Sequence, residues 1–265
     1  MTLQARILFT LAVVMCLLVC FAAPPANAQV MKWTIDGVSR EAMIIPPSKA
    51  NASGKAPAIF AFHGHGGNMH ETAAGMRFEN FWPQAIVVYL QGLPTNPSAD
   101  PQGYGWIYNT GHDGDRDVKF FDAVLATLRE KFPVDNRRIY ATGFSNGGMF
   151  TYVLWGTRAN VFAAFAAVAG RIVPAVHLTE PKPILHVAGE QDTTVPFKDQ
   201  LQAIKIAREL DGTNKEGTPC GQNCTTYRSA KGTPVVTYIH TGGHVYPPGT
   251  SEMIVKFFEG QSLGQ

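Results

Sequence analysis

Short apolar runs along this chain alternate with longer segments in which apolar residues recur at every third or fourth position. The runs are rich in β-branched residues and have the length of buried strands. Besides an N-terminal hairpin at 33–45, which turns through Asp36-Gly37, we expect strands at 58–62, 85–90, 138–142, 162–168, 184–188 and 235–240. Strands that alternate with helices predict an α/β fold, with a mostly parallel central sheet and helices on both of its faces.

The spacing that predicts helices is clearest between Asp115 and Phe132. Val118 and Leu125 belong to one apolar stripe, acidic residues stand at the start of the segment, and Pro133 follows it. Further helices are expected from 148 onward, at 197–210 and at 251–258. In a mostly parallel sheet, ligands bind beyond the carboxyl ends of the strands, so we expect the functional residues in the loops that follow strands.

The composition fits a single folded domain. With 45% hydrophobic and 16% charged residues in a length of 265, the chain can bury a substantial core and lacks the composition of a disordered protein. No internal repeat and no linker divides the sequence. We therefore expect one domain at 29–265.

The first 28 residues have the pattern of a secretory signal peptide. Arg6 precedes an apolar stretch at 7–23, and Ala26-Asn27-Ala28 forms a small-residue cleavage site. A retained membrane anchor is the alternative, but the stretch is short for a spanning helix and the cleavage site follows it at once. The sequence therefore predicts a secreted or periplasmic chain that starts at Gln29 and is not inserted in a membrane.

Charge and cysteine content narrow the classes of partner. Loss of the leader removes one basic residue, Arg6, and leaves 21 basic against 20 acidic residues. This balance gives no indication of nucleic-acid binding.

Cys220 and Cys224 form an even pair in a chain expected to be exported, which indicates a local disulfide in the loop 218–226. Zinc is the alternative, but two cysteines without nearby histidines provide only half of a site.

The pattern Gly143-Phe144-Ser145-Asn146-Gly147 stands between a predicted strand and a predicted helix. Small residues two positions either side of a serine allow a tight turn that lifts its Oγ above the edge of the sheet. Such a pattern also arises by chance in a chain with 26 glycines. Ser145 is our candidate nucleophile, because other parts of a catalytic site follow in the sequence.

A glycine-rich turn, His63-Gly64-His65-Gly66-Gly67, follows the strand predicted at 58–62. Backbone N–H groups in such a turn can stabilise the negative charge that develops on a carbonyl oxygen during acyl transfer. We expect the N–H groups of His65 and Asn146 to form this oxyanion hole. A metal site at His63 and His65 is the alternative, but no third ligand has a suitable spacing.

Two further loops provide an acid and a base. A carboxylate at Asp192 can accept the Nδ1 hydrogen of a catalytic histidine and fix its tautomer. Glu190 is the rival for this role, and Asp199 is the third candidate because it is expected inside the following helix. His244 follows the last predicted strand and is the candidate general base. The chain order Ser145, Asp192, His244 is that of the α/β hydrolases.

These motifs together resemble those of a known group. They are His63-Gly64-x-Gly66-Gly67, Pro133-Val134-Asp135, the stretch 138–149, Gly189-x-x-Asp192-x-x-Val195-Pro196 and Gly242-Gly243-His244 ahead of Pro247. The chain is similar, over about 35–258, to the secreted poly(3-hydroxybutyrate) depolymerase and feruloyl esterase group of α/β hydrolases. The resemblance implies a Ser145, Asp192, His244 triad and hydrolysis of carboxylic esters without a cofactor. At His65 the group often has a smaller residue or cysteine, and at Tyr246 it commonly has tryptophan.

The substrate is less well defined by the sequence. We expect Trp106, Val195, Phe197 and Tyr246 to bind it, because aromatic loop residues can form a wall near the serine and two of the four flank the acid. The sequence contains no polymer-binding module, which favours soluble or oligomeric esters. Feruloyl, acetyl and 3-hydroxybutyryl esters all stay open, as does the oligomeric state. An acyltransferase or peptidase on the same fold, and a non-catalytic binding protein, are the alternative functions.

Overall fold

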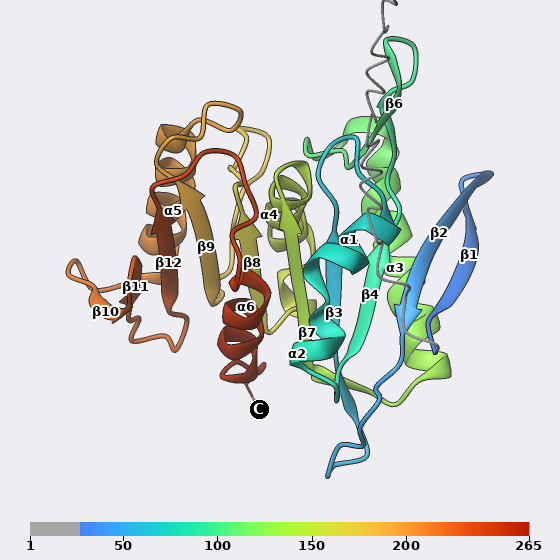
Figure 1. Cartoon of the computed structure of the whole chain (residues 1–265), viewed down its shortest axis with the longest axis horizontal. Coiled ribbons are helices and arrows are strands. Elements are labelled where there is room, and N and C mark those ends of the chain that lie inside the picture. Colours follow the sequence, from blue (N-terminus) through green and yellow to red (C-terminus); the bar gives the residue numbers. More distant parts are fainter. Residues whose placement is uncertain (1–26, 265) are drawn as a thin grey trace, which may run out of the picture.

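A ten-stranded sheet crosses the molecule and separates two layers of helices (Figure 1). The computed structural model describes residues 27–264. The strands lie in the order β1-β2-β4-β3-β7-β8-β9-β12-β11-β10, and neighbours from β4 to β12 are parallel. Antiparallel hairpins form both ends of the sheet. The predicted α/β architecture with a mostly parallel sheet is confirmed.

The elements alternate along the chain as the sequence predicts. The strands are β1 (Gln29–Ile35), β2 (Val38–Ile45), β3 (Ala56–Phe62), β4 (Ile86–Leu90), β5 (Leu93–Asn96), β6 (Asp100–Gly105), β7 (Val134–Phe144), β8 (Ala164–Val168), β9 (Ile184–Gly189), β10 (Thr218–Gly221), β11 (Cys224–Tyr227) and β12 (Val235–His240). The α-helices are α1 (Met69–Met76), α2 (Phe78–Phe81), α3 (Arg116–Lys131), α4 (Asn146–Arg158), α5 (Phe197–Asp211) and α6 (Thr250–Glu259). Short 3₁₀ turns lie at His112–Asp115 and Ala159–Val161.

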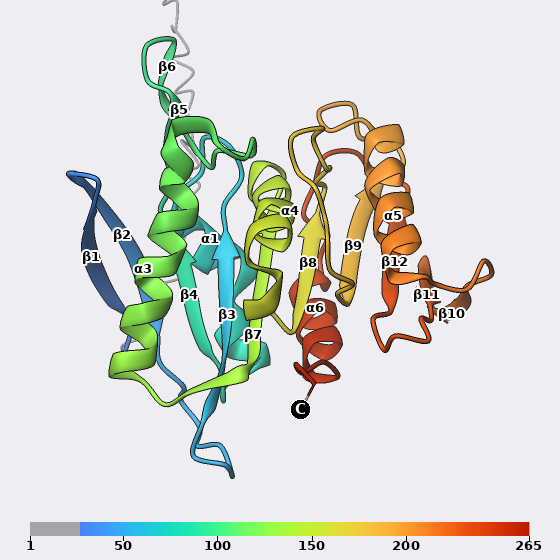
Figure 2. The same ribbon diagram turned by 180° about the vertical axis from the view of Figure 1, so that it is seen from behind.

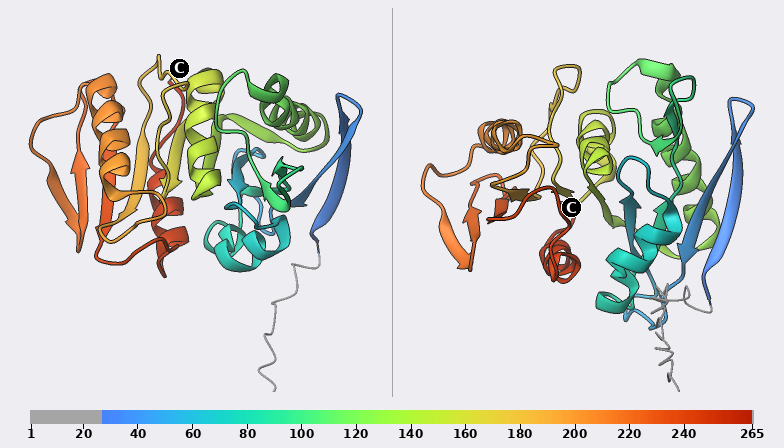
Figure 3. Two further views of the ribbon diagram at one scale, coloured as in Figure 1. Left: turned by 90° about the horizontal axis from the view of Figure 1, so that it is seen from above. Right: turned by 45° about the horizontal axis from the view of Figure 1, so that its top comes forward.

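Each face of the sheet has its own apolar core. Helices α1, α2 and α6 cover the face toward the viewer in Figure 1, and α3, α4 and α5 cover the opposite face (Figure 2). Viewed from above, the two layers lie on either side of the sheet (Figure 3). Strand β3 is buried along its whole length because both of its faces are covered. On one face Phe60 of β3 packs edge-to-face against Phe121 of α3, with ring centroids 4.9 Å apart.

Several elements differ from the sequence predictions. The N-terminal hairpin begins earlier, at Gln29, and β7 extends beyond 138–142 in both directions. Helices α1 and α2 and the hairpins β5–β6 and β10–β11 were not predicted. These elements are short, and the two hairpins contain proline and glycine, which are depleted in strands. In the two hairpins, tertiary contacts rather than local pattern therefore determine the strands.

The predicted leader, 1–28, lies outside the described residues apart from its last two positions. Within 27–264, no helix has the length and apolarity needed to cross a membrane. Cys220 and Cys224 are joined by a disulfide that bridges β10 and β11, so the pairing expected from the sequence is present. The same described range contains no cluster of three or more His, Cys, Asp or Glu side chains suited to a metal ion.

Candidate active site

Ser145 occupies a sharp turn between β7 and α4. Its backbone has φ 55° and ψ −117°, a region that residues with a side chain rarely adopt. The glycines on either side are required by close packing: a Cβ on Gly143 would collide with the backbone of Gly147, and one on Gly147 would collide with the carbonyl of Phe62. This part of the sequence therefore folds as a tight elbow that presents the serine at the end of its strand.

Ser145, His244 and Asp192 lie within hydrogen-bond distance of one another. The Nε2 atom of His244 is 2.8 Å from Ser145 Oγ, and its Nδ1 atom is 2.8 Å from Asp192 Oδ2. The three residues follow β7, β12 and β9, which all end at the same edge of the sheet. In the neutral imidazole with its hydrogen on Nδ1, His244 donates to the carboxylate and accepts from the serine hydroxyl. That arrangement can draw a proton from Ser145.

The carboxylate of Asp192 is buried and accepts N–H groups at both oxygens. Its Oδ1 accepts from the backbone N–H of Thr194 and Val195, each at 2.9 Å, and its Oδ2 accepts from Gln200 Nε2 at 2.9 Å as well as from His244. Donors of this kind stabilise a negative charge and fix its orientation. The rival acids lie elsewhere, Glu190 exposed in the loop and Asp199 in the first turn of α5. The structure thus places Asp192 beside the histidine.

The glycine-rich turn lies against the elbow. A Cβ on Gly64 would come within 3.5 Å of the Cβ of Ser145, so the backbone here approaches the serine closely. Within the turn, Gly66 donates to Tyr104 O at 2.8 Å and Gly67 donates to Gly64 O, and no hydrogen bond within 27–264 uses the N–H of His65. The N–H groups at the start of α4, beginning with Asn146, likewise have no acceptor inside the helix. Both expected oxyanion donors lie next to Ser145 in the chain or in space.

His63 is a structural part of the turn. Burial lowers its pKa below the usual value, which keeps the ring neutral. Its Nε2 accepts the N–H of Gly92 at 2.9 Å, so its Nδ1 carries the hydrogen and donates to Gly64 O at 2.7 Å. His65 instead lies 3.1 Å from Asp100 Oδ2 on the β5–β6 hairpin. The two histidines that suggested a metal site are therefore directed to different partners.

Trp106 does not line the site, contrary to the prediction from sequence. Its side chain is fully buried, packs against Phe62 and Phe150, and donates its indole N–H to His63 O at 3.0 Å. Its backbone is held by the side chain of Asn146, which accepts the Trp106 N–H at 2.7 Å and donates to the Trp106 carbonyl at 2.9 Å. A large aromatic ring in a loop beside an apolar core is buried rather than exposed to ligand. Trp106 thus connects the elbow to the glycine-rich turn.

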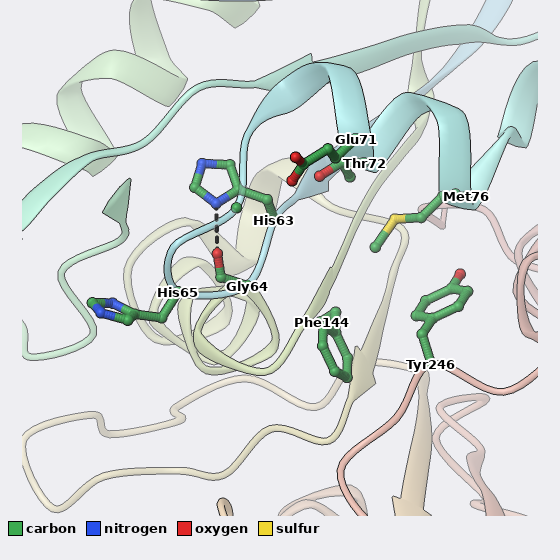
Figure 4. A pocket seen from close by; sticks show the side chains of 10 residues that line it. His63, Gly64, His65, Glu71, Thr72, Met76, Phe144 and Tyr246 are labelled. Carbon is green, nitrogen blue, oxygen red and sulfur yellow. Dashed lines mark hydrogen bonds between the residues drawn. The ribbon is translucent and has the colours of Figure 1, made fainter. Parts of the chain in front are cut away.

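A pocket of about 370 Å³ adjoins the elbow at Phe144, the residue before Ser145. Its walls come from the glycine-rich turn, from α1 and from the residues next to Ser145 and His244 (Figure 4): His63, Gly64, His65, Gly67, Glu71, Thr72, Gly75, Met76, Phe144 and Tyr246. Tyr246, which the sequence predicts to bind substrate, is one of these wall residues. Val195 is buried against Asp192 and, like Phe197, does not belong to this wall.

Sequence reasoning missed the contribution of α1 to the pocket. The helix follows the N-cap residue Asn68, whose side chain accepts the N–H of Glu71 at 2.9 Å. An N-cap residue followed by an acid three positions later is a recognisable start signal for a helix. This signal lies directly after the glycine-rich turn, and it would have placed Glu71 and Met76 near the site.

One family profile and several described proteins match this chain. A profile of the "Prolyl oligopeptidase family" matches residues 101–173. The chain is 32% identical over 232 residues to a protein described as "Putative esterase NocK" from Nocardia uniformis subsp. tsuyamanensis, covering 73% of this chain and 66%, just under two thirds, of that relative. It is 27% identical over 198 residues to "Probable feruloyl esterase C" of Aspergillus clavatus, covering 72% of this chain and 70% of the relative.

Similarity to solved structures supports the architecture. The acetyl xylan esterase from Aspergillus awamori superposes with a TM-score of 0.68 at 15% identity, covering 88% of this chain and 99% of the other. At that identity the likeness concerns the fold alone. It matches the parallel sheet with helices on both faces that is described above.

Proposed function

Because this chain belongs to an esterase group of the α/β-hydrolase superfamily, and is a carboxylester hydrolase, we propose that it cleaves its ester through an acyl-enzyme formed on Ser145. The observation that carries the proposal is the pair of 2.8 Å contacts that His244 makes with the serine Oγ and with Asp192. No cofactor is required for this chemistry, since the nucleophile, the base and the acid are all side chains.

The first half-reaction transfers the acyl group to the enzyme. Oγ of Ser145 attacks the ester carbonyl carbon while His244 Nε2 takes the hydroxyl proton, and the carbonyl oxygen becomes an oxyanion. The N–H groups of His65 and Asn146 stabilise that oxyanion in the tetrahedral intermediate. When the intermediate collapses, the carbon–oxygen bond to the alcohol breaks and the imidazolium returns its proton to the leaving alkoxide. The acyl group is then bonded to Ser145.

The second half-reaction uses water in place of the alcohol. His244 takes a proton from the water, the resulting hydroxide attacks the acyl carbon, and the collapse of the second tetrahedral intermediate returns a proton to Oγ of Ser145. The carboxylic acid leaves and the free enzyme is restored. In both half-reactions Asp192 stabilises the imidazolium form of His244. Its hydrogen bond keeps one proton on Nδ1, the atom that faces the carboxylate.

The pocket suggests the size of the substrate. A volume of about 370 Å³, walled by Phe144, Met76 and Tyr246, suits an acyl or alcohol group of modest size with an apolar surface. We propose feruloyl, acetyl or short 3-hydroxybutyryl esters as the substrate class, and the name "Probable feruloyl esterase C" of one relative supports the first of these. Export through the leader at 1–28, with cleavage before Gln29, forms part of the proposal. It would place the enzyme in the periplasm or outside the cell.

The proposal is tested with Ser145→Ala. The variant should lose about 10³-fold or more of kcat on p-nitrophenyl acetate while its unfolding curve stays cooperative, because the hydroxyl is the nucleophile. A fluorophosphonate probe should label the wild type and not the variant. The matched control is Ser229→Ala, which removes a hydroxyl bonded to Asp211 O, far from the site in the fold, and should leave both readouts unchanged.

The opposite outcome has a clear meaning. If Ser145→Ala keeps more than about a tenth of the wild-type turnover, the serine is not the nucleophile. The fold and the triad are also compatible with an acyltransferase or a peptidase. Replacing the ester by the matching anilide tests the peptidase alternative. Faster cleavage of the anilide than of the ester would favour a peptidase.

A further inference from the structure

Behind Asp192 lies a set of buried polar side chains that the serine chemistry does not use. Gln200, in the first turn of α5, is fully buried and donates Nε2–H to Asp192 Oδ2 at 2.9 Å, the same oxygen that faces His244 Nδ1. Its second Nε2 hydrogen goes to Val195 O at 2.7 Å. Because both amide hydrogens have acceptors, the orientation of the amide is fixed, and Oε1 is left as an acceptor on the other side.

His186 lies on that other side. It projects from β9, is fully buried, and its Nε2 atom and Gln200 Oε1 have no hydrogen-bond partner of good geometry within 27–264. Burial lowers the pKa of His186 to about 4, and the neighbouring side chain of Gln200 opposes this shift by hydrogen bonding. The imidazole is therefore neutral with a single N–H. Since Gln200 Oε1 can only accept, the hydrogen of His186 belongs on Nε2.

Tyr152 completes the set from helix α4. Its hydroxyl oxygen lies 2.6 Å from His186 Nδ1 and is fully buried. Burial raises the pKa of Tyr152 far above its usual value, so the hydroxyl keeps its proton. With the hydrogen of His186 on Nε2, its Nδ1 is an acceptor and Tyr152 donates to it. The donors thus all point one way, from the tyrosine through the histidine to the amide and on to the carboxylate.

We propose that Tyr152, His186 and Gln200 form a buried relay of hydrogen bonds that positions the catalytic carboxylate. The proposal rests on the serine mechanism proposed above. Successive hydrogen bonds in a low-dielectric interior polarise one another, and a bond donated to a charged oxygen is stronger than one between neutral groups. The relay therefore holds Asp192 Oδ2 within hydrogen-bond distance of His244 Nδ1.

The relay also connects elements that carry different parts of the site. Helix α4 begins directly after the nucleophile and contains Tyr152, strand β9 contains His186 and leads into the loop of Asp192, and α5 contains Gln200. The acid is therefore fixed, through buried side chains, relative to the helix that follows the nucleophile. None of the three relay residues lines the pocket. Each is a positioning residue whose effect reaches the reaction only through the carboxylate.

Other titratable groups lie near Asp192 and His244. His240, at the end of β12, and Glu190, in the loop before the acid, are the titratable neighbours, and burial lowers the pKa of His240 while Asp192 and Glu190 oppose that shift. Phe144 packs against His244, and Tyr246 packs against Phe144. The relay side chains are uncharged. A change in the pH profile on mutating them therefore reports on hydrogen bonding to the carboxylate and not on removal of a charge.

The test replaces Gln200 by methionine, which has a similar length and no N–H. With one donor fewer, more of the negative charge of Asp192 is available to the protonated form of His244. The acidic limb of the pH profile of kcat/KM should therefore move to higher pH, by about half a unit or more. The value of kcat on p-nitrophenyl acetate, expressed per site labelled by a fluorophosphonate, should fall about tenfold.

A second variant covers the case in which Gln200→Met folds poorly. Tyr152→Phe removes only the hydroxyl at the far end of the relay, and it should shift the acidic limb in the same direction by a smaller amount. The matched control is Tyr140→Phe, another fully buried tyrosine, whose hydroxyl donates to Gln261 O at 2.6 Å outside the relay. Loss of that bond should lower stability and leave the position of the limb unchanged.

The outcomes separate the relay from the mechanism on which it rests. If the wild-type profile has no acidic limb, or if Ser145→Ala stays active, the serine mechanism is wrong. If the wild type has the limb and neither Gln200→Met nor Tyr152→Phe moves it, the relay is wrong although the mechanism holds. A shift of equal size in Tyr140→Phe would also overturn the relay, because buried tyrosine hydroxyls in general would then have this effect.

Discussion

The side chain of Asn146 offers a sensitive test of how the site is assembled. It accepts the backbone N–H of Trp106 at 2.7 Å and donates to the carbonyl of the same residue at 2.9 Å. Asn146→Ala removes both bonds and adds no new group. Because the Trp106 side chain has no solvent exposure and both bonds are buried, water cannot readily replace either partner. Two backbone polar groups would be left without partners in the interior.

The size of the effect follows from that count. Leaving one buried polar group unpaired costs about 1 to 3 kcal/mol, so two such groups would cost about 2 to 6 kcal/mol. Because single substitutions rarely cost more than about 4 kcal/mol, the variant should unfold with a free energy about 2 to 4 kcal/mol below that of the wild type. For a domain of this length, such a loss lowers the melting temperature by roughly 5 to 15 °C. Total stability is about 5 to 15 kcal/mol in ordinary domains, so the variant should still fold at low temperature.

The assay is urea unfolding followed by fluorescence, together with kcat on p-nitrophenyl acetate. Trp106 also donates its indole N–H to His63 O in the glycine-rich turn, so displacement of its backbone should disturb the oxyanion hole and lower kcat about tenfold or more. The control is Asn80→Ala, which removes an exposed amide from α2 and should change the free energy of unfolding by less than about 0.5 kcal/mol. Equal stability of the two variants would refute the reasoning.

Two further predictions concern charged groups. Asp192→Asn should lower kcat by a factor on the order of 10⁴, whereas Glu190→Gln should have little effect. Steady-state kinetics of the two variants measure this ranking, and the opposite ranking would identify Glu190 as the acid. Burial raises the pKa of Asp211 to about 7 in the folded chain. The folded chain therefore keeps a proton that the unfolded chain releases at lower pH. As a result, the free energy of unfolding falls as the pH rises from the pKa of Asp211 in the unfolded chain toward about 7. Urea unfolding at about pH 5 and about pH 8 measures this loss of stability, which should be smaller in Asp211→Asn than in the wild type. An equal loss in the two proteins would contradict the prediction.

The sequence predicts those parts of the fold that leave a local pattern. Buried strands such as β3 and β4 are continuous apolar runs, and α3 has a regular apolar stripe, so their places could be predicted within a few residues. The tight turn at Ser145 could also be anticipated, because only small residues fit at Gly143 and Gly147. In these cases the physical constraint lies within a short stretch of chain.

Other features depend on contacts that no local pattern records. Trp106 lies in a polar, glycine-rich loop, and its burial follows from distant partners such as Phe150 and His63. The relay joins Tyr152, His186 and Gln200 across three elements, and none of these residues belongs to a recognisable motif. Hydrogen bonds between distant side chains depend on the register of the folded sheet. They become visible only when the strands are in place.

The two edge strands of the central sheet, β10 and β1, differ in how readily they can pair with a strand of another molecule. An edge strand presents unpaired N–H and C=O groups that can template aggregation. Strand β10 is only four residues long, its register is interrupted between Pro219 and Gly221, and a disulfide closes it onto β11. A proline has no N–H to offer a further strand. Strand β1 is seven residues long and has no such interruption, so self-association of partly unfolded chains should begin at the N-terminal border, where Lys32 is the exposed charge that opposes it.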